Sequence, residues 1–263
     1  MRTMDPQQPS DVLDTTSSFN VESLADSKVI FFVRHGQSEG QLDPSAYAII
    51  GDGALKLTPL GHEQSFATGR LLDVFAHKAK LQLPLTLHFG TSVRTHETAQ
   101  DILATSRFIQ YAETSPDERL EKQKFGVFDG MLSSRERAEK QPVAFAQYKH
   151  QLATLGEFRA KPEGGESIED VFTRMKEFNA EILRDPRPSI VVTHGLPELC
   201  GEAALLGHDE NWIMEKADTV QNASIRMVYG TSEKGFRAVT LVERPTEVLD
   251  PDRFVDGFGT LSR

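Results

Sequence analysis

The triplet Arg34-His35-Gly36 directly follows the apolar residues 29–33. A continuous apolar run of this length is typical of a strand buried on both faces of a sheet, so the triplet predicts a guanidinium and an imidazole at the end of such a strand. An unprotonated imidazole nitrogen can act as a nucleophile, and a neighbouring arginine can bind an anion through two parallel hydrogen bonds. We interpret His35 as a candidate nucleophile and Arg34 as an anion-binding group.

Two further strand-like runs end near side chains of the same kind. Residues 189–193 lead into His194-Gly195, and residues 85–89 lead toward Arg94. In open α/β sheets, ligands collect outside the carboxyl ends of the strands, so we expect these side chains to converge with the first arginine and histidine. Two histidines and two arginines would form a cationic pocket suited to a phosphate group. The backbone amides after Gly195, at a helix start, would add to this anion site.

The order of strand-like and helix-like segments predicts the fold class. Strands are expected at residues 28–33, 85–89 and 189–193, and near 223–229 and 237–243. Helices are expected from Pro59 to about Lys78, after Arg94 to about Leu103, over 136–155 with an interruption at Pro142, after Ser167 through Ile182, and from about Pro197 to Leu206, with a loop at 115–135. We expect Glu166 and Ser167 to cap their helix. This alternation predicts one α/β domain, residues 28–263, with a mostly parallel central sheet and helices on both faces.

The composition argues against several classes of partner and location. A net charge of −10 and a pI near 5.3 argue against nucleic acid, since that binding depends on Lys and Arg neutralising phosphates. The longest apolar runs fall far below the roughly 18 residues that indicate a transmembrane helix, which argues against a membrane. Residues 1–27 are polar and without periodicity, which predicts a disordered segment, and they lack the basic start and apolar stretch of a signal peptide. We expect a cytoplasmic protein.

Cys200 is the single cysteine, so neither an intramolecular disulfide nor a cysteine-built metal site is possible. An Ala- and Leu-rich helical pattern follows it, and not a phosphate-binding loop that ends in Arg. We therefore interpret Cys200 as a small buried apolar residue. No spacing among the histidines indicates a zinc site, so we expect no metal and no cofactor.

Longer motifs around these residues resemble those of the histidine phosphatase superfamily, also called phosphoglycerate mutase-like, in their usual order. They are Arg34-His35-Gly36-Gln37-Ser38-Glu39-Gly40-Gln41, Leu57-Thr58-Pro59-Leu60-Gly61, Arg94-Thr95-His96-Glu97-Thr98-Ala99, Gly165-Glu166-Ser167-Ile168-Glu169-Asp170-Val171 and Thr193-His194-Gly195. The motifs cover roughly residues 28 to 225, and their spacing is most similar to the small phosphatase-like members. The resemblance implies a phosphoglycerate mutase-like fold and a phosphohistidine on His35, with Arg34, Arg94 and His194 completing the phosphate pocket.

Two positions depart from the family pattern. The first motif usually closes with Asn, where this chain has Gln41, a longer amide that we retain as a phosphate-binding residue. The segment from Leu120 to Gly126 is similar to one in which a Glu donates a proton to the leaving group, and Lys122 occupies the place of that Glu. Glu121 lies one residue away. Because adjacent side chains of an extended segment point in opposite directions, Glu121 can replace the missing acid only if the loop shifts.

These observations lead to one principal hypothesis and two alternatives. The principal hypothesis is a metal-independent phosphomonoesterase that acts through phosphohistidine on His35, with Glu121 or Lys122 as the proton donor. The first alternative is a pseudophosphatase that binds phosphorylated ligands or partners and turns over poorly because of Lys122. The second, a phosphoglycerate mutase, is disfavoured by the small-phosphatase spacing. The expected substrate is a phosphorylated small molecule or a phosphoprotein.

Overall fold

A six-stranded sheet, with the strand order β3-β2-β4-β1-β5-β6, lies at the centre of the protein. The computed structural model describes residues 24, 26–107, 109 and 112–248. Its strands are β1 (Lys28–Arg34), β2 (Thr86–Phe89), β3 (Glu113–Pro116), β4 (Ser189–Thr193), β5 (Ile225–Thr231) and β6 (Gly235–Val242). The pairs β1–β4, β2–β4 and β2–β3 are parallel, whereas β5 pairs antiparallel with both β1 and β6. The predicted single α/β domain with a mostly parallel sheet is therefore confirmed.

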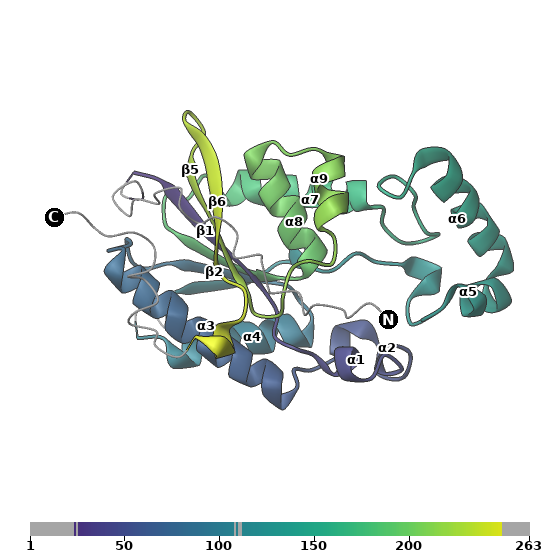
Figure 1. The fold of residues 1–263 in the computed structure, drawn as a ribbon, viewed down its shortest axis with the longest axis horizontal. Helices are drawn as coiled ribbons and strands as arrows, with labels where there is room; N and C mark the ends of the chain where they lie inside the picture. Colours follow the sequence, from purple (N-terminus) through teal and green to yellow (C-terminus); the bar gives the residue numbers. More distant parts are fainter. Residues whose placement is uncertain (1–23, 25, 108, 110–111, 249–263) are drawn as a thin grey trace, which may run out of the picture.

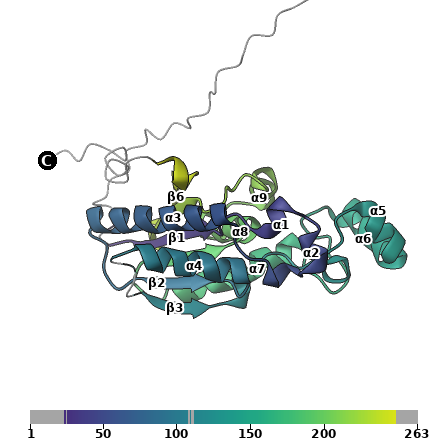
Figure 2. The same cartoon turned by 90° about the horizontal axis from the view of Figure 1, so that it is seen from below.

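Helices cover both faces of this sheet, as Figures 1 and 2 show. The helices are α1 (Glu39–Leu42), α2 (Ala46–Ile49), α3 (Pro59–Lys78), α4 (Val93–Thr105), α5 (Ser134–Lys140), α6 (Pro142–Leu155), α7 (Ile168–Ile182), α8 (Gly195–Leu206) and α9 (Glu210–Lys216), with 3₁₀ turns η2 (Asp52–Ala54), η4 (Glu118–Leu120), η5 (Gly126–Phe128) and η6 (Pro245–Glu247). Helices α3 and α4 pack on one face, and α7 and α8 pack on the other.

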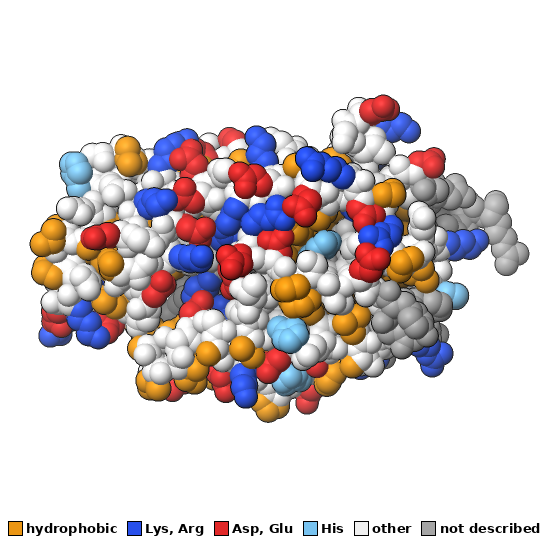
Figure 3. Space-filling view, turned by 180° about the vertical axis from the view of Figure 1, so that it is seen from behind, with side chains coloured by type: hydrophobic (Ala, Val, Ile, Leu, Met, Phe, Trp, Pro, Cys, Tyr) orange, Lys and Arg blue, Asp and Glu red, His pale blue; other side chains and the backbone are white. Residues whose placement is uncertain are grey.

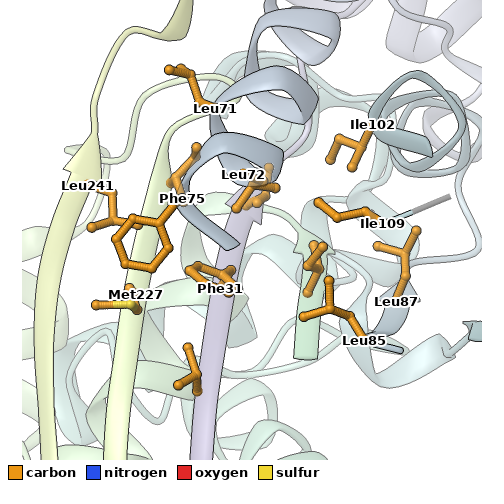
Figure 4. Close-up of a cluster of buried hydrophobic side chains, with 14 of the residues drawn as sticks. Phe31, Leu71, Leu72, Phe75, Leu85, Leu87, Ile102, Ile109, Met227 and Leu241 are labelled. Atoms are coloured by element: carbon orange, nitrogen blue, oxygen red, sulfur yellow. The ribbon is translucent and has the colours of Figure 1, made fainter. Parts of the chain in front are cut away.

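The apolar run of β1 is continuous because both of its faces are buried. Alternate residues contact different cores. Phe31 belongs to the cluster formed with α3 and α4, where its ring meets Phe75 edge-on at a centroid distance of 5.6 Å (Figure 4). Phe32 belongs to the opposite cluster, with Met175 of α7 and Cys200 of α8. Each fully buried side chain of this size contributes about 1.5–3 kcal/mol, so β1 is firmly fixed in the centre of the sheet.

The structure corrects one expected segment. The predicted loop at 115–135 is wrong in part, because β3 covers its beginning and η4 and η5 follow. All four residues of β3 are exposed, and the strand pairs with β2 through its backbone, so no apolar alternation marked it in the sequence. The expected interruption at Pro142 separates α5 from α6, where this proline occupies the first turn of α6.

The ends of the chain fall mostly outside the described residues. The disorder expected for 1–27 concerns residues that are nearly all outside the description, and 249–263 are outside it too. Leu24 is described, and it is buried in the same cluster as Phe31. The packed part of the chain therefore includes a residue before the first strand.

Candidate active site

The predicted residues meet at the carboxyl ends of the parallel strands. Arg34 is the last residue of β1, His194 follows β4, and Arg94 lies in the first turn of the helix after β2. Glu121 follows η4. The segment after β1 continues into α1, and the segment that carries Glu121 continues through η5 into α5. In both Figure 1 and Figure 2, α1 and α5 lie at the same end of the molecule. Residues that are far apart in sequence therefore share one site.

His35 has the protonation state that a nucleophile needs. Its side chain is buried, and its Nδ1 lies 2.7 Å from the carbonyl oxygen of Gly36. A carbonyl oxygen only accepts hydrogen bonds, so Nδ1 carries the proton and Nε2 has a free lone pair. Burial lowers the pKa of His35 well below its usual range, and the nearby His194 and Arg94 lower it further. The imidazole is therefore neutral at physiological pH.

His194 adopts the complementary state. Its ring centroid is 4.9 Å from that of His35, and its Nδ1 lies 3.5 Å from a guanidinium nitrogen of Arg94. A guanidinium only donates, so Nδ1 accepts and Nε2 carries the proton. Burial, followed by the charge of Arg94, lowers the pKa of His194 well below its usual range. His194 can therefore donate a hydrogen bond from Nε2 while it remains neutral.

The two arginines are held by backbone carbonyls. Arg94 is 1% exposed; its Nη1 donates to the carbonyl oxygen of Asp52, and its Nη2 lies 3.3 Å from a carboxylate oxygen of the same residue. Arg34 donates from Nη1 to the carbonyl oxygen of Val220. Its Nε lies beside the backbone of Gly195, where an added Cβ would be 3.9 Å away. The charges of both guanidinium groups lower the pKa of His35 and of His194, and the carbonyl contacts hold these groups in place.

Glu121, rather than Lys122, contacts His194. A carboxylate oxygen of Glu121 lies 3.4 Å from Nε2 of His194, and its other oxygen accepts the Ser92 amide at 2.6 Å. The Lys122 ammonium lies 3.0 Å from the carboxylate of Asp52 and 4.6 Å from the ring centroid of Tyr47. The expected opposite directions of these adjacent side chains therefore do not keep either one from the site, because Glu121 contacts His194 and Lys122 contacts Asp52, which is itself paired with Arg94.

The amide of Gln41 is bonded to Ser38 and Asn222. Its oxygen accepts the Ser38 amide at 3.0 Å, and its nitrogen donates to Asn222 at 2.9 Å. Asn222 in turn donates to the carbonyl oxygen of His35 at 2.9 Å. Gln41 therefore supports the backbone of His35 through Asn222, and its contact with phosphate stays a prediction.

Gly195 is the first residue of α8, where amides lack intrahelical acceptors, and His194 is the N-cap. This position meets the expectation of a helix start beside the pocket. Whether those amides bind phosphate stays a prediction.

Close backbone contacts explain why the sequence motifs occur together. An added Cβ at Gly36 would lie 2.4 Å from the carbonyl oxygen of Gly61, and one at Gly61 would lie 2.1 Å from that of Gln37. The Gly36 amide also donates to the Thr98 hydroxyl at 3.1 Å. Three motifs from β1, α3 and α4 therefore pack directly against one another. Gly36 and Gly61 are required because a side chain would collide with the neighbouring backbone, and not because their own backbone angles need glycine.

The expected caps of α7 are half correct. Ser167 is the N-cap, since its hydroxyl accepts the Asp170 amide. Glu166 has a different role: its carboxylate accepts the Lys124 amide at 3.0 Å and pairs with Arg174 at 2.9 Å. Arg174 also donates to the carbonyl oxygen of Glu121 at 2.6 Å. Glu166 and Arg174 therefore fix the segment that carries Glu121, which the sequence did not indicate.

The family assignment follows from a match over most of the chain. The model of the histidine phosphatase superfamily (branch 1) matches residues 30–243. The chain belongs to this superfamily. Within it, the phosphoglycerate mutase-like protein AT74 of Arabidopsis thaliana is 29% identical over 183 residues, which are 64% of this chain and 54% of that protein. The chain therefore spans about half the length of this curated relative.

Solved structures share the superfamily fold. The alpha-ribazole phosphatase from Shigella flexneri has a TM-score of 0.63 at 17% identity, over 82% of this chain and 96% of that chain. The mycobacterial glucosyl-3-phosphoglycerate phosphatase, in a complex with VO3, has a TM-score of 0.57 at 22% identity, over 81% of this chain and 98% of that chain. At these identities the likeness establishes the fold.

Four further observations concern the core and the surface of the described residues. Cys200 is fully buried, and burial raises the pKa of its thiol to about 12, which confirms it as a core residue. No helix in the described part of the chain is long and apolar enough to span a membrane. Among the same residues, no group of three or more His, Cys, Asp or Glu side chains is arranged to hold a metal ion. Lys and Arg interleave with Asp and Glu on the face in Figure 3.

Vanadate or sulfate is expected to bind between Arg34, His35, Arg94 and His194. We expect Arg94→Met to weaken this binding by about 10- to 100-fold, because one charge-assisted contact contributes about 1.5–3 kcal/mol. Isothermal titration of both proteins tests this, with Arg135→Met as the control because Arg135 is 87% exposed on α5. A bound-anion structure with the oxyanion elsewhere would contradict the assignment.

Proposed function

We propose that this protein is a metal-independent phosphomonoesterase that acts through a phosphohistidine on His35. The observation that carries the proposal is the neutral His35, with its Nε2 lone pair free and two arginines and a histidine N–H around it. In this arrangement a phosphoryl group has both a nucleophile and donors for its oxygens. The known relatives named as phosphatases support the same class of reaction.

The proposed reaction has two steps. The Nε2 lone pair of His35 attacks phosphorus, the P–O bond of the ester breaks, and the leaving oxygen takes a proton from the Glu121 carboxyl group. A water molecule then attacks the phosphohistidine, gives a proton to Glu121, and the N–P bond breaks to release inorganic phosphate. Arg34 and Arg94 offset charge on the phosphoryl oxygens, and His194 donates from Nε2.

Glu121 is the proposed acid because its carboxyl group already lies in the pocket. It is 3.4 Å from the His194 ring, on the side where Nε2 projects. The substrate we propose is a phosphorylated small molecule or a phosphoprotein. A cytoplasmic location is part of the proposal, and a single fully buried cysteine fits a reducing compartment.

A turnover assay with a panel of phosphomonoesters tests the proposed function. We expect phosphate release in the presence of EDTA, because His35 supplies the nucleophile that a metal-bound water would otherwise provide. Rapid quenching without acid, after reaction with a ³²P-labelled substrate, should leave a labelled protein. The bond that holds the label should be labile to acid and stable to base. Complete inhibition by EDTA, restored by added metal, would overturn metal independence.

One observation favours the alternative of a weak, phosphate-binding pseudophosphatase. The Asp52 carboxylate lies against Arg94 and Lys122, so it already occupies donors that a phosphoryl group would use. If the protein is a pseudophosphatase, sulfate or vanadate binds in the titration while no ester in the panel is hydrolysed. Turnover of any ester at an enzymatic rate rejects this alternative.

A further inference from the structure

A buried acid lies in the helix turn that follows His194, and it has no role in the proposed reaction. Glu198 is in the first turn of α8, four residues after His194, and is 1% exposed. Its Oε2 has no hydrogen-bond partner among the described residues. An isolated buried carboxylate is costly, so such a group is retained as a neutral acid or is paired with a cation.

Arg34 is the arginine of the candidate phosphate site whose charge acts on Glu198, and it is also incompletely paired. Its Nε is buried without a partner in the described part of the chain, next to the backbone at the start of α8. Glu198 is the strongest charge that acts on the Arg34 guanidinium, ahead of Tyr47, Asp218 and Arg94. Gly195 and Glu198 are three residues apart on α8, a spacing at which helix residues are neighbours, so a carboxyl group and a guanidinium, each with an unpaired buried atom, both lie at the first turn of α8.

Only a few other charged groups act on Glu198. Arg226 on β5 attracts its negative charge and Glu202, one turn further along α8, repels it. Arg226 also pairs with Glu202 at 2.6 Å, and its charge acts on Glu198 more strongly than that of Arg34. On the neighbouring elements, Arg174 of α7 acts on Cys200, and Lys216 of α9 acts on Glu202. Burial is the largest effect, and it raises the pKa of Glu198 to about 8.

We propose that Glu198 is a positioning residue for Arg34. When Glu198 is a neutral acid, the guanidinium binds the phosphate. When Glu198 is a carboxylate, it attracts the guanidinium and weakens anion binding. The proposal rests on the proposed function, since it concerns the same phosphate pocket. Because the pKa of the folded protein is raised, the neutral form predominates below about pH 8 and the charged form above it. Anion affinity should therefore fall as the pH rises through this value.

Sulfate is the probe, because its own charge is constant between pH 6.5 and 9.5. We expect its dissociation constant in the wild-type protein to rise about tenfold across this range, the order for one charge within about 10 Å of an anion at an effective dielectric constant of about 20. The catalytic histidines do not titrate in this range, because burial lowers the pKa of both well below their usual values. Isothermal titration at several pH values measures the effect.

Glu198→Gln is the deciding variant, since its side chain is neutral at every pH and has nearly the same shape. We expect its sulfate affinity to be independent of pH over this range. The pKa of Lys28 is also lowered to about 8, but Lys28 lies at the other end of β1 and stays in place in this variant. Any pH dependence of sulfate affinity that came from Lys28 would therefore persist in Glu198→Gln. If Glu198→Gln does not fold, by circular dichroism, Glu198→Met replaces it.

Glu202→Gln is the matched control on the same helix. Removing the repulsion by Glu202 should lower the pH at which the sulfate dissociation constant rises. The size of that rise should be unchanged. The inference is overturned if Glu198→Gln retains the wild-type pH dependence, if the wild type has none, or if Glu202→Gln abolishes it. Failure of sulfate to bind at any pH overturns the phosphate pocket itself, and with it both this inference and the proposed function.

Discussion

His35→Ala is expected to lower the turnover of every phosphomonoester by about 10⁴-fold or more, because removal of the nucleophile leaves only binding and electrostatic stabilisation. The charges of both arginines act on the His35 imidazole, whose Nε2 has a free lone pair. The same variant should give no acid-labile phosphoenzyme. Initial rates with a soluble aryl phosphate, together with the ³²P trapping experiment, measure both effects.

Two controls make this result specific to the imidazole. His150→Ala removes an exposed histidine from α6 and should retain the wild-type rate. His35→Ala should still unfold cooperatively near the wild-type temperature, since the motif is held by backbone contacts of Gly36 and Gly61. Full activity of a folded His35→Ala protein would reject the phosphohistidine mechanism.

Glu121→Gln is expected to have the second-largest effect, and the effect should depend on the leaving group. Loss of a general acid costs about 10²- to 10⁴-fold when the leaving alkoxide needs a proton. We therefore expect this loss for alkyl phosphates and a much smaller one for p-nitrophenyl phosphate, whose phenolate leaves without a proton. Steady-state rates with both esters, for the wild type and the variant, give the comparison.

Lys122→Glu is the matched test of the alternative reading of this segment. If Lys122 replaces the acid that the family resemblance implies at this position, Lys122→Glu raises the turnover of alkyl phosphates more than that of aryl phosphates. The structure favours Glu121, because its carboxyl group contacts His194 while the Lys122 ammonium pairs with Asp52. A Glu121→Gln protein with unchanged alkyl turnover, beside an activated Lys122→Glu protein, would reverse the assignment.

The sequence was sufficient for most of the sheet and for the position of the candidate phosphate-binding residues. Strand β1 is recognisable because burial on both faces requires a continuous apolar run, and the residues that follow parallel strands must meet at one edge of the sheet. Arg34, His35, Arg94 and His194 could be named for this reason alone. Strand β3 could not be found, because an exposed edge strand joined through its backbone leaves no pattern in its side chains.

Tertiary structure decided what surrounds those four residues. The choice between Glu121 and Lys122 depends on how Arg174 and Glu166, more than 40 residues further along the chain, hold the segment that carries both. The contact of Asp52 with Arg94 likewise depends on the path of a loop. The sequence by itself therefore determined the residues that lie at strand ends. The charge state of each group was decided by burial and by neighbours from distant segments, and a linear pattern records neither.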